Sequence, residues 1–128
     1  MRSLVIAILV TLAALAGACG DSQPSPEQGS ESVVAEVQAM YDAKCARCHN
    51  GNGNGHGPFS DSLIPRPHDY TDPAWQASVT DDQIKEIILK GGIHMHKNPA
   101  MLGSPMLKKR PEVLNGLVKL IRSFAKRP

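Results

Sequence analysis

Two cysteines and a histidine form the most reactive cluster of side chains in this sequence. Cys45 and Cys48 are separated by two residues, and His49 follows the second cysteine directly. On a helix this spacing puts both sulfur atoms on one side, about one turn apart, with the imidazole beside them. Two thiols in this arrangement can form thioether bonds to the vinyl groups of a haem while the imidazole binds the iron. The pattern Cys-x-x-Cys-His therefore indicates covalent attachment of haem.

A redox-active dithiol and a zinc site are the two other uses of such a cysteine pair. A thioredoxin-like dithiol needs a surrounding βαβ pattern, which this sequence lacks. A four-ligand zinc site would have to recruit His49 and a second, distant histidine. We therefore expect one covalent haem c, held by Cys45 and Cys48, with His49 as an iron ligand.

The segment between residues 93 and 110 offers candidates for the second axial ligand of the iron. It contains His94, Met95, His96, Met101 and Met106. A ligand loop must leave one helix, cross the haem and return to the next helix, so a residue near its middle has the most slack. Met101 meets this condition and follows the rigid stretch Asn98-Pro99-Ala100. We expect Met101 to bind the iron, with Met106 as the first alternative and the other three residues after it.

The cysteine motif must be carried by a first helix. Ser30 and Ser32 offer caps, and the apolar residues at positions 34, 37, 40 and 41 recur at helical spacing. We expect this helix to run to about Lys44, directly into the motif.

Two later segments also predict helices. Thr80 and Gln83 predict a capping box for a helix that stops at Gly91-Gly92. Pro111 suits the first position of a final amphipathic helix. The apolar face of that helix contains Val113, Leu114, Leu117, Leu120, Ile121 and Phe124.

The stretches between these helices are predicted to be loops. Glycine alternates with asparagine and histidine from residue 50 to residue 57, and four prolines make the chain irregular up to Trp75. So long an irregular stretch in a small domain needs something to organise it, and a haem wrapped by loops would do so. Because no period-two pattern predicts a strand, we expect an all-α fold of about three to five helices.

The N-terminal residues predict export. Arg2 precedes an apolar run from Leu4 to Leu15, followed by small residues, which is typical of a signal peptide over residues 1–18. Cys19 predicts a lipid anchor, because an unpaired cysteine outside the cytoplasm needs an explanation. Ordinary cleavage beside Cys19 is the alternative. We expect residues 19–32 to be a flexible linker, residues 33–128 to form the domain, and the protein to be periplasmic or otherwise extracytoplasmic, tethered to a membrane.

These segments together resemble the class I monohaem cytochromes c, including those that are subunits of oxidases and dehydrogenases. The resemblance covers about residues 33–126, including the haem motif, residues 65–72, the helix end at 91–92 and residues 117–123. It implies the small cytochrome c fold, in which the first and last helices cross beside the haem. It also implies that a carbonyl near a proline accepts a hydrogen bond from the outer nitrogen of His49. Pro58 is the closer candidate and Pro65 the second.

The resemblance implies electron transfer by one six-coordinate haem with His/Met ligation, and no enzymatic activity of the chain itself. By the same similarity, Tyr70 and Trp75 lie near the haem edge, although core packing explains them equally well. Two alternatives stay open: a haem subunit of a larger oxidoreductase, and an open-coordination haem domain that acts as an enzyme or sensor. We expect a monomer that makes transient contacts with other redox proteins.

Charge divides the chain into an acidic and a basic half. Residues 19–86 hold four bases and eleven acids, a net charge of −7, and residues 87–128 hold nine bases and one acid, a net charge of +8. Solvated helix faces would explain this division. Alternatively, the basic half docks on an acidic partner. The bases expected to do so are Lys108, Lys109, Arg110, Lys119 and Lys126. Nucleic acid is not an expected partner of an exported chain with nearly balanced charge.

Overall fold

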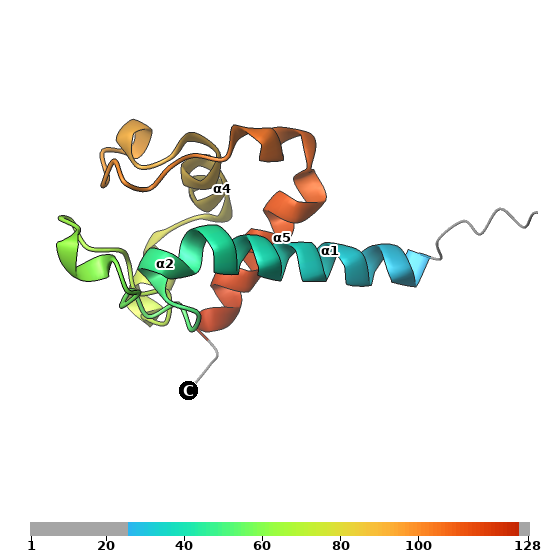
Figure 1. Ribbon diagram of the computed structural model, residues 1–128, viewed down its shortest axis with the longest axis horizontal. Helices are drawn as coiled ribbons and strands as arrows, with labels where there is room; N and C mark the ends of the chain where they lie inside the picture. Colours follow the sequence, from blue (N-terminus) through green and yellow to red (C-terminus); the bar gives the residue numbers. More distant parts are fainter. Residues whose placement is uncertain (1–25, 126–128) are drawn as a thin grey trace, which may run out of the picture.

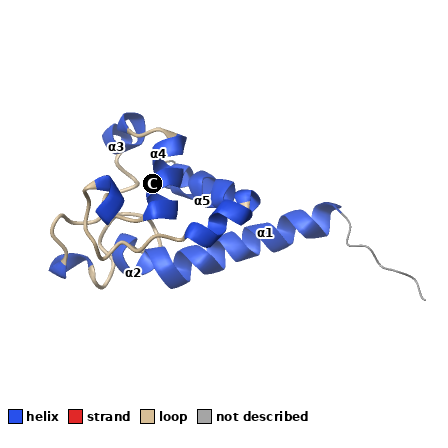
Figure 2. Ribbon diagram, turned by 90° about the horizontal axis from the view of Figure 1, so that it is seen from above, coloured by secondary structure: helices blue, strands red, loops and turns tan. Residues whose placement is uncertain are grey.

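The computed structural model describes residues 26–125, and within this range it contains helices and turns but no strand (Figure 2). The α-helices are α1 (Pro26–Met40), α2 (Ala46–His49), α3 (Pro73–Ser78), α4 (Asp81–Lys90) and α5 (Pro111–Phe124). A π-helical turn, Tyr41–Cys45, joins α1 to α2, and 3-10 turns occur at Ser60–Ser62, Ile93–Met95 and Pro105–Lys109. This architecture confirms the expected all-α class.

The first helix begins earlier than expected. We expected a linker up to residue 32 and caps at Ser30 or Ser32, but α1 starts at Pro26, a residue that suits the first position of a helix. Its buried face also differs, because Val37 is buried whereas Val34 is 66% exposed. Val33 packs against the core in place of Val34.

Helices α1 and α5 cross and form the centre of the fold (Figure 1). At the crossing, a Cβ atom on Gly116 would stand only 2.5 Å from Cγ2 of Val37, so the glycine permits the close approach. The rings of Tyr41 and Phe124 lie 5.3 Å apart between centroids. The buried hydrophobic residues around them are Val37, Tyr41, Tyr70, Ile84, Leu107, Val113, Leu114, Leu117, Val118, Ile121 and Phe124.

The glycine-rich loop after α2 packs against the end of α5. Gly53 has φ of +78°, and a Cβ atom there would stand 2.6 Å from the Phe124 ring. Tyr41 donates a hydrogen bond from its hydroxyl to the Asn50 carbonyl at 2.8 Å. The loop is therefore a fixed part of the fold, held by the core aromatic residues.

The segment from residue 70 to residue 92 is more regular than expected. The irregular stretch ends early because Asp72 caps α3, its carboxylate accepting a hydrogen bond from the amide of Ala74 at 2.8 Å. The predicted capping box of Thr80 and Gln83 is present and starts α4. The predicted end of α4 is also confirmed, since Gly91 has φ of +80°.

Arg122 on α5 holds the connection between α3 and α4. Its guanidinium donates to the carbonyls of Gln76 and Val79, at 2.7 and 2.6 Å, and to the Asp81 carboxylate at 2.8 Å. The side-chain amide of Gln76 in turn donates to the carbonyl of Tyr70 at 2.7 Å. This network ties the last helix to the segment that carries the aromatic residues.

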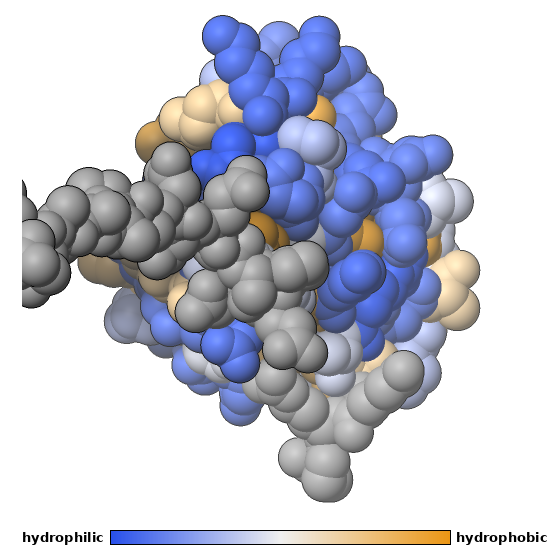
Figure 3. Space-filling model, turned by 90° about the vertical axis from the view of Figure 1, so that its right-hand side faces the viewer, coloured by the Kyte–Doolittle hydropathy of each residue, from blue (hydrophilic) through white to orange (hydrophobic). Residues whose placement is uncertain are grey.

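The face seen from the right-hand side of Figure 1 is mainly hydrophilic, with only small hydrophobic patches showing (Figure 3). Among residues 26–125, no helix has both the length and the apolar character that a membrane crossing needs.

Candidate functional site

The end of the first helical segment brings the cysteine motif together. Cys45 is the last residue of the π-helical turn, and Cys48 and His49 belong to the short helix α2 that continues from it. Both cysteines are free thiols of intermediate exposure. Burial raises the pKa of the Cys45 thiol to about 11, so this sulfur is protonated at neutral pH. Two thiols about one turn apart are suited to addition across a pair of vinyl groups.

His49 is held in a single tautomer. Its Nδ1 atom lies 3.3 Å from the carbonyl oxygen of His68. Because a carbonyl can only accept, Nδ1 carries the proton and Nε2 has the free lone pair. Burial lowers the pKa of His49 to about 4, which keeps the imidazole neutral at neutral pH. A neutral imidazole with its outer nitrogen bonded to a carbonyl is the usual state of a metal-binding histidine.

The carbonyl partner of His49 differs from the expected ones. We expected an oxygen near Pro58 or Pro65, but the acceptor belongs to His68, which follows Pro67. The reason lies in the path of the chain. The amide of Tyr70 donates to the Gly53 carbonyl at 2.7 Å, which brings residues 67–70 alongside the glycine-rich loop and under His49.

Tyr70 connects His49 to an aromatic cluster. Its ring stacks on the imidazole, with 4.4 Å between centroids, and its hydroxyl lies 3.0 Å from Nε2. Trp75 lies 4.8 Å from Tyr70 and 5.6 Å from the ring of His68. Since Nε2 has one lone pair, iron binding at that atom requires the Tyr70 hydroxyl to leave it.

A cavity of about 250 Å³ lies beside this cluster. Its walls come from the aromatic cluster, from the isoleucines of α4 and from the loop that follows α4. The lining residues are His68, Tyr70, Trp75, Ser78, Val79, Gln83, Ile84, Ile87, Ile88, Met95, Lys97, Met101 and Ile121. Tyr70 both lines the cavity and contacts His49, so the two parts of the site adjoin.

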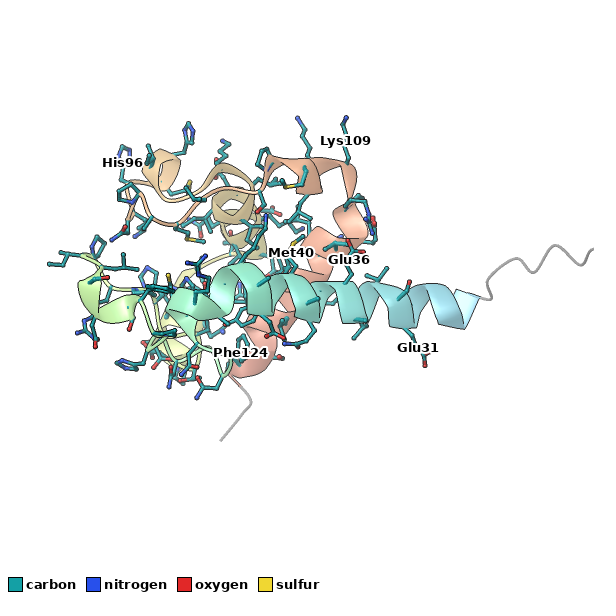
Figure 4. The ribbon with its side chains drawn as sticks, in the orientation of Figure 1. Glu31, Glu36, Met40, His96, Lys109 and Phe124 are labelled. Carbon is teal, nitrogen blue, oxygen red and sulfur yellow. The ribbon has the colours of Figure 1, made fainter. Side chains whose placement is uncertain are left out.

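The cavity distinguishes among the candidates for the second iron ligand. Met101 and Met95 both line it, whereas Met106 is 55% exposed and does not. His94 and His96 are also exposed and away from its walls. Figure 4 shows His96 at the outer edge of the loop that follows α4. The structure therefore brings Met101 to the site and leaves Met106, the first alternative from the sequence, outside it.

These residues fit a covalently attached haem. The chain supplies two neighbouring thiols, an imidazole with a lone pair on Nε2, and a largely apolar cavity that contains thioether sulfur. The zinc alternative finds no ligand set, because no group of three or more His, Cys, Asp and Glu residues is placed to bind a metal within residues 26–125.

Sequence reasoning missed two parts of this site. Met95 was placed low among the ligand candidates, because its position only three residues after Gly92 left little slack for a chain crossing a haem. A 3-10 turn at Ile93–Met95 shows that a single tight turn suffices to bring Met95 to the cavity wall. The network of Gln76 and Arg122 was not predicted, because these residues are far apart in the sequence and the segment 117–123, which contains Arg122, does not indicate its partners.

Comparisons with known proteins agree with this geometry. A family model described as Cytochrome c matches residues 34–124. Among solved structures, the KustC0563 c-type cytochrome is similar, with a TM-score of 0.51 and 28% sequence identity, over 69% of this chain and 95% of that chain. No curated protein matches the sequence.

Proposed function

This chain belongs to the cytochrome c family, and on that premise we propose that Cys45 and Cys48 attach its haem while His49 and Met101 bind the iron. Family membership implies one covalent haem c and electron transfer through it. When bound, the haem iron supplies one-electron chemistry by alternating between ferrous and ferric states. With both axial positions taken by the chain, no position would be left for a substrate, and the protein acts as a carrier.

The main support for this proposal is the hydrogen bonding and the neutral form of His49. The bond from Nδ1 to the His68 carbonyl fixes the direction of the ring and leaves Nε2 as the donor atom. This hydrogen bond also strengthens the imidazole as a ligand. A histidine one residue after the second thiol, already buried and neutral, supports a role at the iron more directly than the sequence motif alone.

Met101 is favoured over Met95 because its backbone is held on both sides. Its carbonyl accepts a hydrogen bond from Gly92 at 2.8 Å, and its amide donates to Asn98 at 3.1 Å. The stretch also packs closely on the end of α4, since a Cβ atom on Gly91 would stand 2.8 Å from the Met101 carbonyl oxygen. A ligand on a fixed backbone keeps the same coordination in both oxidation states.

The other residues of the cavity exclude water and other ligands. Ile84, Ile87 and Ile88 present an apolar wall, and the aromatic cluster closes the side next to His49. An apolar environment disfavours the additional positive charge of ferric iron, so these residues raise the reduction potential.

We also propose that the protein works outside the cytoplasm, as is typical of class I cytochrome c domains. The signal peptide at 1–18 and the lipid anchor at Cys19 support this proposal from the sequence alone. These positions lie outside the described residues. The proposed partners are other redox proteins, met in brief contacts near the membrane surface.

Intact mass spectrometry of the denatured protein tests the attachment of the haem. Protein from cells competent for cytochrome maturation should exceed the polypeptide mass by one haem, because thioether bonds survive denaturation. The double variant Cys45→Ser and Cys48→Ser should have the bare polypeptide mass. A bare mass for the unaltered chain would overturn the proposal.

A further inference from the structure

The loop after His49 contains a chemical feature that electron transfer does not use. Three Asn-Gly pairs follow one another at residues 50–51, 52–53 and 54–55. In such a pair the amide nitrogen of the glycine can attack the side-chain carboxamide of the asparagine, because glycine has no side chain to obstruct the approach. Asparagine is thermolabile for this reason. In the folded chain, however, the three pairs differ in their hydrogen bonds and in their packing.

The second and third pairs are held in place. The Gly53 amide donates to the carbonyl of Asn50 at 3.1 Å, and the Gly55 amide donates to the carbonyl of His49 at 3.0 Å. Both glycines have positive φ, and a Cβ atom would stand 2.6 Å from Phe124 at Gly53 and 2.9 Å from the Pro67 carbonyl at Gly55. Their nitrogens can attack a carboxamide only after these hydrogen bonds break and the backbone leaves a tightly packed position.

The first pair has its attacking nitrogen beside the target carboxamide. The Gly51 amide donates to Oδ1 of its neighbour Asn50 at 2.8 Å, so the nitrogen is in contact with the carboxamide that it would attack. Gly51 is exposed, and a Cβ atom there would meet nothing within 4 Å. One contact opposes the reaction, since Nδ2 of Asn50 donates to Oδ1 of Asn54 at 3.1 Å. Further hydrogen bonds from Gly53 and Tyr41 hold the carbonyl of Asn50, but the exposed Gly51 leaves the pair open to water and to a base in the solvent.

We propose that Asn50 is a site of deamidation, selected by the fold from three Asn-Gly sequences. The Gly51 nitrogen loses its proton to a base in the solvent and forms a bond to Cγ of Asn50. The Nδ2 amino group takes a proton from the solvent, the bond from Cγ to Nδ2 breaks, and ammonia leaves, which gives a cyclic imide. Water then opens the imide at one of its two carbonyl carbons and yields aspartate or isoaspartate.

The modification places a negative charge one residue after the proposed iron ligand. The new carboxylate cannot donate to Asn54, whose Oδ1 also accepts from the amide of His56 at 3.0 Å. In an isoaspartate the main chain passes through Cβ and Cγ, and the former main-chain carbonyl, which accepts the Tyr41 hydroxyl, becomes the free carboxylate. A carboxylate near the iron favours the ferric state, so the reduction potential should fall. This consequence rests on the proposed function, whereas the covalent step does not.

Peptide mapping after incubation of the whole haem protein in mildly alkaline buffer tests the covalent step. Deamidation adds about one dalton, and fragmentation of the peptide identifies the residue that carries it. Asn50 should react at least roughly fivefold faster than Asn52 or Asn54, the factor that corresponds to about 1 kcal/mol for one broken amide hydrogen bond. In denaturant the three rates should approach one another, because the hydrogen bonds that distinguish the pairs are gone.

Gly51→Ala is the matched control. The added methyl group meets nothing in the folded chain, so the fold and haem spectrum should be unchanged while the reaction at Asn50 slows. Equal rates at all three asparagines in the folded protein would overturn the proposal, and so would an undiminished rate in Gly51→Ala. Separately, Asn50→Asp should show a lower reduction potential than the unaltered protein. If the peptide map is as expected but the potential is unchanged, the proposed place of His49 at the iron is the part that fails.

Discussion

At the scale of single residues, the environment of His49 determines what the site can bind. The His68 carbonyl fixes the proton on Nδ1, and burial keeps the ring neutral. Neither effect can be read from the motif, which gives only the order of the residues. The spacing of Cys45, Cys48 and His49 predicted one shared turn, but the partner carbonyl depends on how residues 67–70 pass under the imidazole.

Tyr70→Phe should leave haem attachment intact. The hydroxyl near Nε2 must leave that atom when iron binds, so its removal costs the haem protein little. Tyr70→Ala, by contrast, removes a buried ring that contacts His49, Trp75 and Phe124 and should lower the free energy of unfolding by about 3 to 5 kcal/mol. Haem content and denaturant unfolding measure the two effects. Loss of haem in Tyr70→Phe alone would show that the hydroxyl has a function at the iron.

At the scale of elements, the crossing of α1 and α5 sets the position of the haem motif. The motif continues from the C-terminal end of α1 (Figure 1), while α5 supplies Phe124, which packs against Gly53 of the glycine-rich loop, and Arg122, which donates to the carbonyl of Gln76 in α3. In this way the two helices fix the glycine-rich loop and the aromatic cluster at the same time.

Gly116→Ala should weaken this crossing. The new Cβ atom would meet Cγ2 of Val37 at 2.5 Å, so the free energy of unfolding should fall by about 1 to 3 kcal/mol. Val37→Ala in the same chain should restore part of the loss, because it removes the obstructing methyl group. Gly29→Ala is the control on α1, where nothing lies nearby, and it should stabilise the helix by roughly 0.5 to 1 kcal/mol. Additive losses for Gly116 and Val37 in a double-mutant cycle would contradict the close contact.

The sequence predicted α4 and α5, which start at recognisable capping residues and at a proline. Thr80 and Gln83 marked the start of α4, and Pro111 marked the start of α5. The start of α1 was placed too late, because the polar composition before Ser30 hid a helix that begins at a proline. Helix α3 was missed although Asp72-Pro73 is a cap followed by a first-position proline. The aromatic cluster and the hydrogen-bond network of Arg122 depend on contacts between distant segments, and local sequence patterns do not contain this information.

At the scale of the whole molecule, ion pairs compensate part of the charge of the basic half. Arg110 is paired with Glu36 and Glu112, and Lys119 borders the groove between α1 and α5. Lys109 points outward from the domain at the top of the view in Figure 4. Lys126 lies outside the described residues. We therefore propose that Lys108 and Lys109, in the exposed turn that precedes α5, contribute most to docking on an acidic partner.

Replacing Lys108 and Lys109 with glutamate should slow electron transfer to an acidic partner at low ionic strength. The effect should fade at high salt, where the screening length decreases to about 3 Å at 1 M. Stopped-flow rates over a range of salt concentrations measure it, with Lys119→Glu as the control for a charge change elsewhere. Equal rates for all variants at low salt would indicate that these lysines are only a solvated face.

Cys19→Ser tests the proposed attachment to a membrane. The variant should move from the membrane fraction to the soluble fraction with its haem spectrum unchanged, because Cys19 precedes the residues that match the cytochrome c family, 34–124. Fractionation of cells, followed by haem staining of denaturing gels, gives the answer. Membrane association that survives the substitution would mean that another segment or a partner holds the protein there.

The absorption spectrum of the ferric protein tests the central claim most directly. Methionine sulfur gives ferric haem a weak long-wavelength band that high-spin haem lacks. We expect the unaltered protein to show this band, Met101→Ala to lose it and become able to bind carbon monoxide in the ferrous state, and Met95→Ala and Met106→Ala to keep it. Persistence of the band in Met101→Ala, with its loss in Met95→Ala, would contradict the assignment and move the ligand to the neighbouring turn.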